Sequence, residues 1–535
     1  MTGRGRTFGD LAGMFRHLAA VKSWALGRAP GFTGLGSPLA VLTPGDGDVA
    51  QQLYHGQFTF AGRSAQVRPS EIFSATPLSA DWLDELHGFA WLRHLEASGL
   101  TLHRAFARGL LRSWQAQRQT SSFAASCQRL LSLSRHAGFL MSGAGAEFET
   151  QFLQIVTREA ERLRNRRGTG QPAQLQQAAA LLAASLAFRG GAFLDAALAR
   201  SAALAPQVIL PDGGHMDRSP KSLAELLADL LPLRAAMLAQ RIAIPHDLNA
   251  AIERGLPMLR MLVHGDGGLA IFQGVERSSP ALVQAILKHD TVGGRPLAHA
   301  PHAGYARMAQ GASAVIIDCG KPALCDSALA FEFSDGAHRI VGSCGMPAHA
   351  SPEWRTAAAS KAAHSTAEVI EHGKARKTVA QAESVTSPHG TLVRALAPSH
   401  QRDFFVATGG LDFRGEDRFD SATPFTIRFH LHPSIKASAD RSGGSVMLLL
   451  PNKHGWRFSA RGARSLWRRA FIWPPARDRA AADRLSFAGR DRKSIGPSAS
   501  LTGGNALAQM QTKPRNCLSE TPHDQSHSPR PDFGF

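Results

Sequence analysis

The stretch Leu210-Pro-Asp-Gly-Gly-His-Met-Asp-Arg-Ser-Pro220 separates two helical patterns in the middle of the chain. Its glycines predict a tight turn, which carries His215 with Arg218 close behind it. A histidine on such a turn, in a strongly basic protein, predicts an enzyme that acts on an acidic polymer. The alternative is a histidine that caps the following helix or bonds to the backbone of the turn.

Helical spacing of apolar residues runs on both sides of this turn. The first clear helix is expected after Ser79, which suits an N-cap, because Trp82, Leu86 and Leu95 recur at helical spacing. Antiparallel helices with short connections favour a bundle, a solenoid or an α/α toroid, and the pattern alone leaves these three open. Further helical patterns cover residues 101–117, 121–140, 146–167, 172–203, 219–242, 245–263 and 278–290.

Short apolar or alternating runs replace the helical pattern after about residue 300. Residues 329–333 and 425–431 are examples, and Gly, Asp and Pro turns bound such runs at the spacing of a β-sandwich. The chain is therefore predicted to be an α+β multidomain protein. A mixed segment over residues 1–78 leads into a helical domain over 79–296, which is followed by a β-sandwich domain over 297–462.

The formal net charge of +18 at pH 7 concentrates anionic partners around the protein. Surface arginine from a GC-rich genome is the other explanation of this charge. Nucleic acid, acidic polysaccharide and anionic membrane are such anionic partners. Because no zinc-finger or aromatic RNA-binding pattern accompanies the charge, nucleic acid is not the expected partner. The five cysteines include no Cys-X-X-Cys pair, which predicts free thiols rather than a disulfide framework.

The first thirty residues are dotted with Arg and Lys and lack the apolar core of a signal peptide. The cytoplasm is therefore the expected location, and the periplasm or cell envelope is the alternative if the start codon is misassigned. No window approaches about 20 consecutive apolar residues, so no transmembrane segment is predicted. The sequence leaves the oligomeric state open.

Seven short segments rich in glycine, histidine and aromatic residues follow one another along the chain. They are His87-Gly-Phe-Ala-Trp-Leu-Arg93, Leu210-Pro-Asp-Gly-Gly-His215 with Arg218-Ser-Pro220, His264-Gly-Asp-Gly-Gly-Leu-Ala270, Ala300-Pro-His-Ala-Gly-Tyr305, Leu329-Ala-Phe-Glu-Phe333, Glu353-Trp-Arg355 with Ala362-Ala-His-Ser-Thr366, and Arg414-Gly-Glu-Asp-Arg418. In this order they resemble the heparinase II/III-like family of bacterial polysaccharide lyases, from about residue 40 to 460. The resemblance implies an N-terminal α/α toroid followed by a C-terminal antiparallel β-sandwich.

The resemblance also implies a reaction, β-elimination at a uronic acid within an acidic polysaccharide such as a glycosaminoglycan. The uronate carboxylate must be neutralised, a base must remove the C5 proton, and an acid must protonate the leaving oxygen. The predicted function is therefore that of a polysaccharide lyase. The alternative is a catalytically degenerate polysaccharide-binding protein of the same architecture.

Two residues of the central turn are the first catalytic candidates. His215 resembles the helical-domain histidine of such lyases, and Asp212 or Asp217 is expected to orient its ring. Arg218 is expected to meet the uronate carboxylate in a bidentate fork.

Aromatic and basic residues complete the predicted site. Tyr305 is expected to serve as acid or base, with packing at the first strand of the β-domain as the alternative. The family's catalytic tyrosine belongs to the helical domain, where this chain has only Tyr54. The predicted substrate-binding residues are His87, Trp91 and Arg93, and core packing is the alternative for Trp91.

His364 resembles a family histidine that ligates a structural zinc in the β-domain. Zinc needs three or four ligands, and the resemblance implies a His in the segment 321–327 and an Asp in the segment 342–345. The first segment of this chain has no His and the second has no Asp. Cys325 and Cys344 are the candidates for a replacement site, and a buried histidine without metal is the alternative. No cofactor besides zinc is suggested.

The last segment, residues 463–535, loses the strand alternation and is rich in Arg, Pro, Ala and Ser, which predicts disorder. A second hypothesis is a frameshift in the gene, because the β-domain still needs closing strands. Family members tend to carry a Ser-Leu-Glu-Glu-Ser-Val-like strand here, and a one-base shift of codons for residues 465–473 can encode it. Resequencing the gene would decide.

Overall fold

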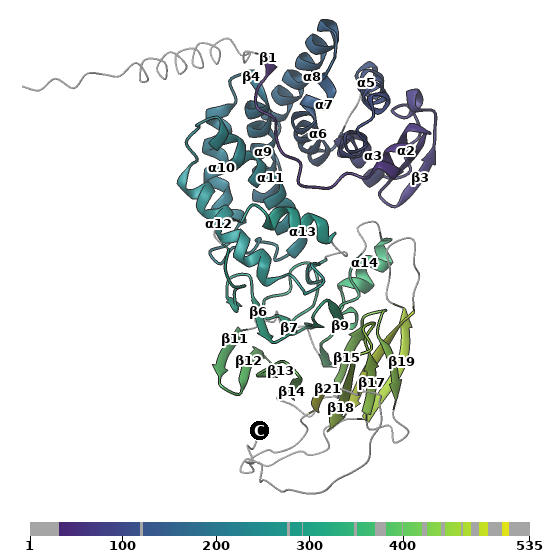
Figure 1. Ribbon diagram of the computed structural model, residues 1–535, viewed down its shortest axis with the longest axis vertical. Helices are drawn as coiled ribbons and strands as arrows, with labels where there is room; N and C mark the ends of the chain where they lie inside the picture. The colour runs from purple at the N-terminus through teal and green to yellow at the C-terminus, as the bar shows by residue number, and fades with distance from the viewer. Residues whose placement is uncertain are drawn as a thin grey trace, which may run out of the picture.

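The computed structural model describes residues 31–117, 121–274, 279–290, 293–346, 350–369, 381–398, 400–419, 425–439, 445–461, 464–471, 481–489 and 506–512. Helices form the N-terminal part, coloured purple to teal in Figure 1, and antiparallel sheets form the C-terminal part, coloured green to yellow. The order of the two domains agrees with the sequence prediction.

The helical domain is an α/α toroid with two small strand pairs. Its helices are α2 (Gly47–Tyr54), α3 (Ala80–Gly88), α4 (Leu92–Ala97), α5 (Thr101–Ala116), α6 (Phe123–Arg135), α7 (Ala137–Met141), α8 (Ala146–Arg164), α9 (Gln171–Ala187), α10 (Leu194–Val208), α11 (Pro220–Ala239), α12 (His246–Met261) and α13 (Pro280–Leu287), with a 3-10 turn η1 (Pro69–Glu71). The strand pairs are β1 (Phe32–Leu35) with β4 (Phe188–Gly190), and β2 (Gln57–Phe60) with β3 (Arg63–Gln66). Within the described part of the chain, no helix combines the length and apolar character needed to cross a bilayer.

Local sequence explains where two of these helices begin. The Ser79 hydroxyl accepts a hydrogen bond from the Trp82 backbone N at 3.1 Å, so the predicted cap of α3 is confirmed. Pro220 opens α11 directly after Ser219, at a position where a missing N–H costs nothing. Helix α9 is rich in alanine and buried on most of its surface, which lets α6, α8, α10 and α11 pack around it.

The β-domain is a sandwich of two antiparallel sheets. The first has the order β19-β20-β15-β9-β8-β7-β6-β5, with β10 also paired to β15, and the second has the order β11-β12-β13-β14-β21-β18-β17-β16. The strands of the first sheet are β5 (His299–Ala300), β6 (Tyr305–Gln310), β7 (Ser313–Asp318), β8 (Phe331–Asp335), β9 (His338–Gly342), β10 (Ala367–Val369), β15 (Phe425–Leu431), β19 (Arg464–Phe471) and β20 (Ala481–Gly489). Those of the second are β11 (Gln381–Ser387), β12 (Gly390–Ala397), β13 (His400–Ala407), β14 (Asp412–Phe419), β16 (Lys436–Ala439), β17 (Ser445–Leu449), β18 (Gly455–Arg461) and β21 (Ala506–Thr512). Helix α14 (Pro352–Ala359) and the 3-10 turn η2 (Lys361–Ala363) lie in the connection between β9 and β10.

Aromatic side chains from both sheets meet in the core of the sandwich. The Phe331 ring of β8 lies 5.2 Å from the Phe404 ring of β13 and 5.5 Å from the Phe413 ring of β14. Phe333 meets Trp456 of β18 edge to face at 5.0 Å. These contacts hold the two sheets face to face and explain the alternating pattern of the strands.

The segment after residue 463 differs from the expected disordered tail. Strand β20 pairs with β15 and β19 pairs with β20, while β21 lies between β14 and β18 and pairs with both. These segments of the given sequence thus take part in both sheets, and the frameshift hypothesis stays a prediction that resequencing the gene tests. Residues 472–480, 490–505 and 513–535 lie outside the described part.

Candidate functional site

The Asp-Gly-Gly turn between α10 and α11 is tightly fixed. A one-residue bridge joins Ile209 to His215, and the Leu210 backbone N donates to the Gly214 carbonyl at 2.7 Å. Gly213 has φ +89°, and a Cβ there would lie 1.9 Å from the Arg254 carbonyl oxygen. Only glycine fits such a position, so the turn delivers His215 to a defined place.

Asp217, rather than Asp212, orients the ring of His215. The His215 Nδ1 lies 2.5 Å from Asp217 Oδ1, and Asp217 also accepts from the Ser219 backbone N at 2.8 Å and from the Ser222 hydroxyl at 2.7 Å. Burial alone raises the pKa of Asp217, but these hydrogen bonds outweigh burial and hold the pKa below its ordinary value. An ionised Asp217 makes Nδ1 the donor, which leaves Nε2 as the acceptor.

Asp212 has a different task, because it fastens the turn to the β-domain. Its Oδ2 accepts from the backbone N of His302 and of Ala303, both at 2.7 Å, and its Oδ1 accepts from the Gly214 backbone N at 3.2 Å. The turn is therefore part of the junction between the two domains.

Helix α11 brings further charged groups near His215. Lys221 lies 3.8 Å from the Glu225 carboxylate, and Arg135 of α6 pairs with Asp229 at 2.6 Å. The Glu225 side chain is 59% exposed at its surface, but the protein around it partly removes its hydration. This desolvation is the main cause that raises the pKa of Glu225, and the carboxylate of Asp229 adds to the effect. Both cations of this cluster are thus paired with carboxylates.

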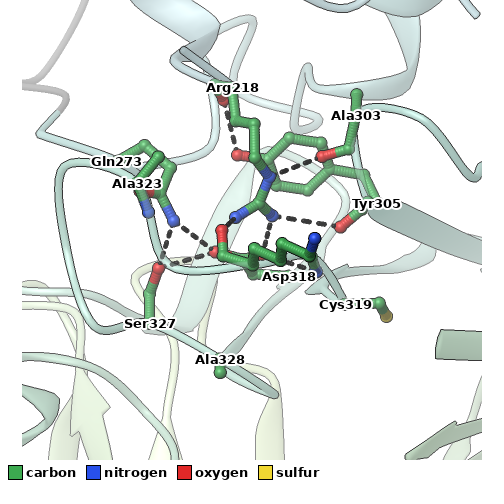
Figure 2. Close-up of polar contacts among 12 residues, drawn as sticks. Arg218, Gln273, Ala303, Tyr305, Asp318, Cys319, Ala323, Ser327 and Ala328 are labelled. Atoms are coloured by element: carbon green, nitrogen blue, oxygen red, sulfur yellow. Dashed lines mark hydrogen bonds and ion pairs between the residues drawn. The ribbon is translucent and has the colours of Figure 1, made fainter. Parts of the chain in front are cut away.

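The Arg218 side chain lies in the domain junction, where Figure 2 shows it beside Asp318 and Ala303. The residue has φ +65°, and its guanidinium forms an ion pair with Asp318 at the end of β7. It also donates to three carbonyl oxygens, those of Ala303 at 2.7 Å, Gly304 at 3.3 Å and Lys321. Burial lowers the pKa of Arg218, but Asp318 more than compensates and the pKa lies above its ordinary value.

The guanidinium of Arg218 is enclosed by close-packed atoms. A Cβ at Gly320 would lie 2.3 Å from its Cζ, so this position requires glycine, and its Cζ lies 5.1 Å from the centre of the Tyr305 ring. This differs from the predicted role, because an arginine whose guanidinium is buried against Asp318 does not present it to a uronate.

Tyr305 lies in the same junction. Its hydroxyl donates to the Arg218 carbonyl at 2.6 Å, and the residue is 1% exposed. Burial is the main cause that raises the pKa of Tyr305 well above its ordinary value, with a further contribution from Asp318. In this position the Tyr305 hydroxyl is buried and bonded to the backbone, and its acid–base role stays a prediction.

The three predicted substrate-binding residues lie around α3 and α4. His87 is 1% exposed and its Nδ1 accepts from the Trp114 indole, while Trp91 is 5% exposed and donates to the Leu86 carbonyl at 2.9 Å. Arg93 is half-buried and donates to the Ala90 carbonyl. Because an exposed ring face is needed to stack on a sugar, the buried rings of His87 and Trp91 differ from their predicted role.

A second Asp-Gly-Gly turn repeats the first and was not recognised as a repeat from the sequence. The His264 backbone N donates to the Gly268 carbonyl at 2.9 Å, and the Gly268 backbone N donates to Asp266 Oδ1 at 2.8 Å, as in the first turn. Asp266 then pairs with Arg339 of β9 at 2.8 Å, and the His264 ring bonds to Glu332 of β8 at 3.0 Å. The repeat is visible in the sequence, because both turns contain Asp-Gly-Gly. In each turn the next residue, His215 or Leu269, forms an isolated β-bridge.

The donor set for zinc does not fit at His364. Among the described residues, no three His, Cys, Asp or Glu side chains gather in a way that would hold a metal. His364 is 2% exposed, and burial lowers the pKa of the ring to about 4. Cys344 instead lies 3.6 Å from the His430 ring, and burial raises the pKa of Cys325 to about 11. The four cysteines of the described part carry free thiols, as predicted, and Cys517 lies outside it.

Comparison with known proteins agrees with this architecture. Residues 292–511 match the family model "Heparinase II/III-like, C-terminal". The chain is 31% identical over 470 residues to FtsZ-localized protein C of Caulobacter vibrioides, covering 77% of this chain and 80% of the relative.

Solved structures share the fold at low identity. Heparinase III superposes with a TM-score of 0.70 at 12% identity, covering 94% of this chain and 90% of that chain. Heparan sulfate lyase HepC of Pedobacter heparinus superposes with a TM-score of 0.60 at 14% identity, covering 94% and 88%. Together with the toroid, the sandwich and the ordered motifs, these matches show that the chain belongs to the heparinase II/III-like family.

Proposed function

We propose that this chain is a catalytically degenerate member of its family, which binds acidic polysaccharide without cleaving it by β-elimination. The observation that carries the proposal is the burial of Arg218 against Asp318. Elimination needs a cation that reaches the uronate carboxylate, because only a neutralised carboxylate makes the C5 proton acidic enough to remove. Four hydrogen bonds to the protein hold this guanidinium in the junction instead.

The charges near His215 support the same proposal. Lys221 and Arg135 face Glu225 and Asp229, so neither cation is left without a carboxylate partner. A uronate placed beside His215 would meet these carboxylates as well as Asp217, and like charges repel. Tyr305 supplies no proton there because its hydroxyl is buried and bonded to the backbone.

Two broader properties support binding as the remaining activity. The net charge of +18 favours association with a polyanion. The relative from Caulobacter vibrioides is named for its localisation with FtsZ and not for a lyase reaction. A role that depends on binding and position, rather than on turnover, fits both properties.

The competing function is that of an active uronate lyase, and one observation favours it. His215 keeps the orienting bond to Asp217, which leaves its Nε2 as an acceptor. In that case His215 would remove the C5 proton, and a cation from elsewhere would have to neutralise the substrate.

One experiment separates the two functions. The full-length protein is incubated with heparin, heparan sulfate and alginate, and the ultraviolet absorbance band of the unsaturated uronate is followed. Binding to the same immobilised polymers is measured in parallel at two salt concentrations. The variants are His215→Ala and, as a control on an exposed histidine of α12, His246→Ala.

We expect flat absorbance traces and salt-sensitive binding with all three proteins. Product formation that His215→Ala abolishes and His246→Ala preserves would establish the lyase and overturn the proposal. A protein that neither cleaves nor binds these polymers would also overturn it, because polysaccharide would then not be its ligand.

A further inference from the structure

The loop between β7 and β8 includes residues 321–327, and several of its residues bond to one buried side chain, that of Gln273. The Gln273 amide nitrogen donates to Asp318 Oδ2 at 2.8 Å and to the Ser327 hydroxyl at 2.7 Å. Its amide oxygen accepts three backbone N–H groups, those of Ala323 at 3.2 Å, Leu324 at 2.9 Å and Cys325 at 3.1 Å.

The position of Gln273 is demanding in two respects. The residue is 0% exposed, so its amide depends on these five bonds in place of water. Its φ is +52°, a left-handed conformation that is unfavourable for a residue with a Cβ. Such a conformation persists only where surrounding contacts compensate for it, and here the compensating contacts are those to the loop.

The bonds of Gln273 continue into the domain junction. Ser327 donates to Asp318 Oδ2 at 2.6 Å, which closes a ring of three side chains (Figure 2). The other carboxylate oxygen of Asp318 holds Arg218. Gln273 thus fixes the loop and the counter-ion of Arg218 at the same time.

We infer that the Gln273 amide, through its five hydrogen bonds, holds residues 321–327 in place and keeps Arg218 on Asp318 without a metal ion. We call this amide and its five bonds the hub. Three converging backbone N–H groups and a neighbouring hydroxyl are held by one neutral side chain, so the loop needs no cation to keep its shape. The inference stands whether or not the protein is a lyase.

Hydrogen exchange of residues 323–325 in the full-length protein tests the hub directly. Gln273→Met keeps the length of the side chain and removes its polar atoms. Gln240→Met is the matched control, because Gln240 makes one hydrogen bond, to the Leu186 carbonyl at 3.0 Å. We expect exchange at 323–325 to be at least about tenfold faster in Gln273→Met than in the wild type and in the control, since each lost bond contributes to protection.

Exchange at 323–325 that is unchanged in Gln273→Met would overturn the inference. Ser327→Ala provides a second test if the methionine variant fails to fold. It removes one of the two acceptors of the Gln273 amide nitrogen and leaves the amide oxygen on the three backbone N–H groups, so we expect protection at 323–325 to remain close to that of the wild type. Loss of protection at 323–325 in Ser327→Ala, with the rest of the chain still protected, would count against the hub as well.

Metal content tests the other half of the inference. We expect the purified protein to hold far less than one zinc per chain and its Tm to be unchanged by a chelator or by added zinc. About one zinc per chain, removed by His364→Leu together with protection at 323–325, would overturn the inference in favour of a metal. His364→Leu with wild-type exchange at 323–325 would support the hub.

Discussion

Removal of the Asp318 carboxylate tests the domain junction most directly. Asp318 is 0% exposed and the Arg218 side chain is 8% exposed, so Asp318→Ala leaves a buried guanidinium without its counter-ion. Breaking a buried ion pair in this way costs about 3–5 kcal/mol. Gln273 and Ser327 also lose an acceptor, which adds about 1 kcal/mol. We therefore expect Asp318→Ala to destabilise the folded protein by about 5 kcal/mol.

A double-mutant cycle isolates the pair from its surroundings. Arg218→Met removes the charge but leaves the carbonyls of Ala303, Gly304 and Lys321 without their donor, so it is destabilising by itself. The double variant has no unpaired charge, and we expect its cost to be about 2–3 kcal/mol less than the sum of the single costs.

Denaturant unfolding followed by circular dichroism gives the free energy of unfolding for the four proteins. The control cycle uses Arg355 and Asp81, an exposed pair that also joins the two domains at 3.3 Å, where we expect a coupling below about 1 kcal/mol. Additive costs for Asp318 and Arg218, within about 0.5 kcal/mol, would refute the structural account of the junction.

Three further predictions concern other parts of the fold. Burial holds the pKa of both His364 and His430 at about 4, below the usual 6.5, so the folded state resists protonation. Stability is therefore complete above pH 6.5 and falls by up to about 3 kcal/mol per histidine as the pH drops towards 4, which acid unfolding should show and His364→Leu should reduce. Gly213→Ala should destabilise by more than about 2 kcal/mol, because its Cβ clashes with backbone, whereas Gly143→Ala, with φ +68° and open space, should cost about 1 kcal/mol; equal unfolding midpoints would contradict this. A chain that ends at residue 503 loses β21 and unpairs β14 and β18, so it should aggregate or unfold at a lower temperature than the full chain, and unchanged melting would mean that the tail is dispensable.

Features that depend on local spacing were predictable from the sequence. Apolar periodicity after Ser79 located α3 and its cap, and the change to alternating runs located the β-domain. The pairing of His215 with Asp217 also follows from local spacing, since a side chain two residues away in a turn lies within reach of the ring.

Features that depend on distant partners were not predictable in this way. Arg218 and Asp318 are one hundred positions apart, and nothing in the letters around either residue indicates the other. The tail was not predictable for the same reason. Strand β21 pairs with β14 and β18 through its backbone, and its amino-acid composition does not indicate this pairing. Composition describes what a segment can do alone, whereas a strand between two others gains most of its stability from its neighbours.

The central turn places its two chemical groups in opposite directions, and this division limits what the protein can do. His215 and Arg218 are three residues apart, but the left-handed backbone at Arg218 sends its side chain to the β-domain while His215 stays with Asp217. One guanidinium cannot both neutralise a uronate and balance Asp318. Releasing it would cost several kcal/mol, and about 4 kcal/mol corresponds to a population near one in a thousand. Lyase chemistry through Arg218 would therefore have to open the domain junction, so the contact that stabilises the fold is also the contact that opposes catalysis.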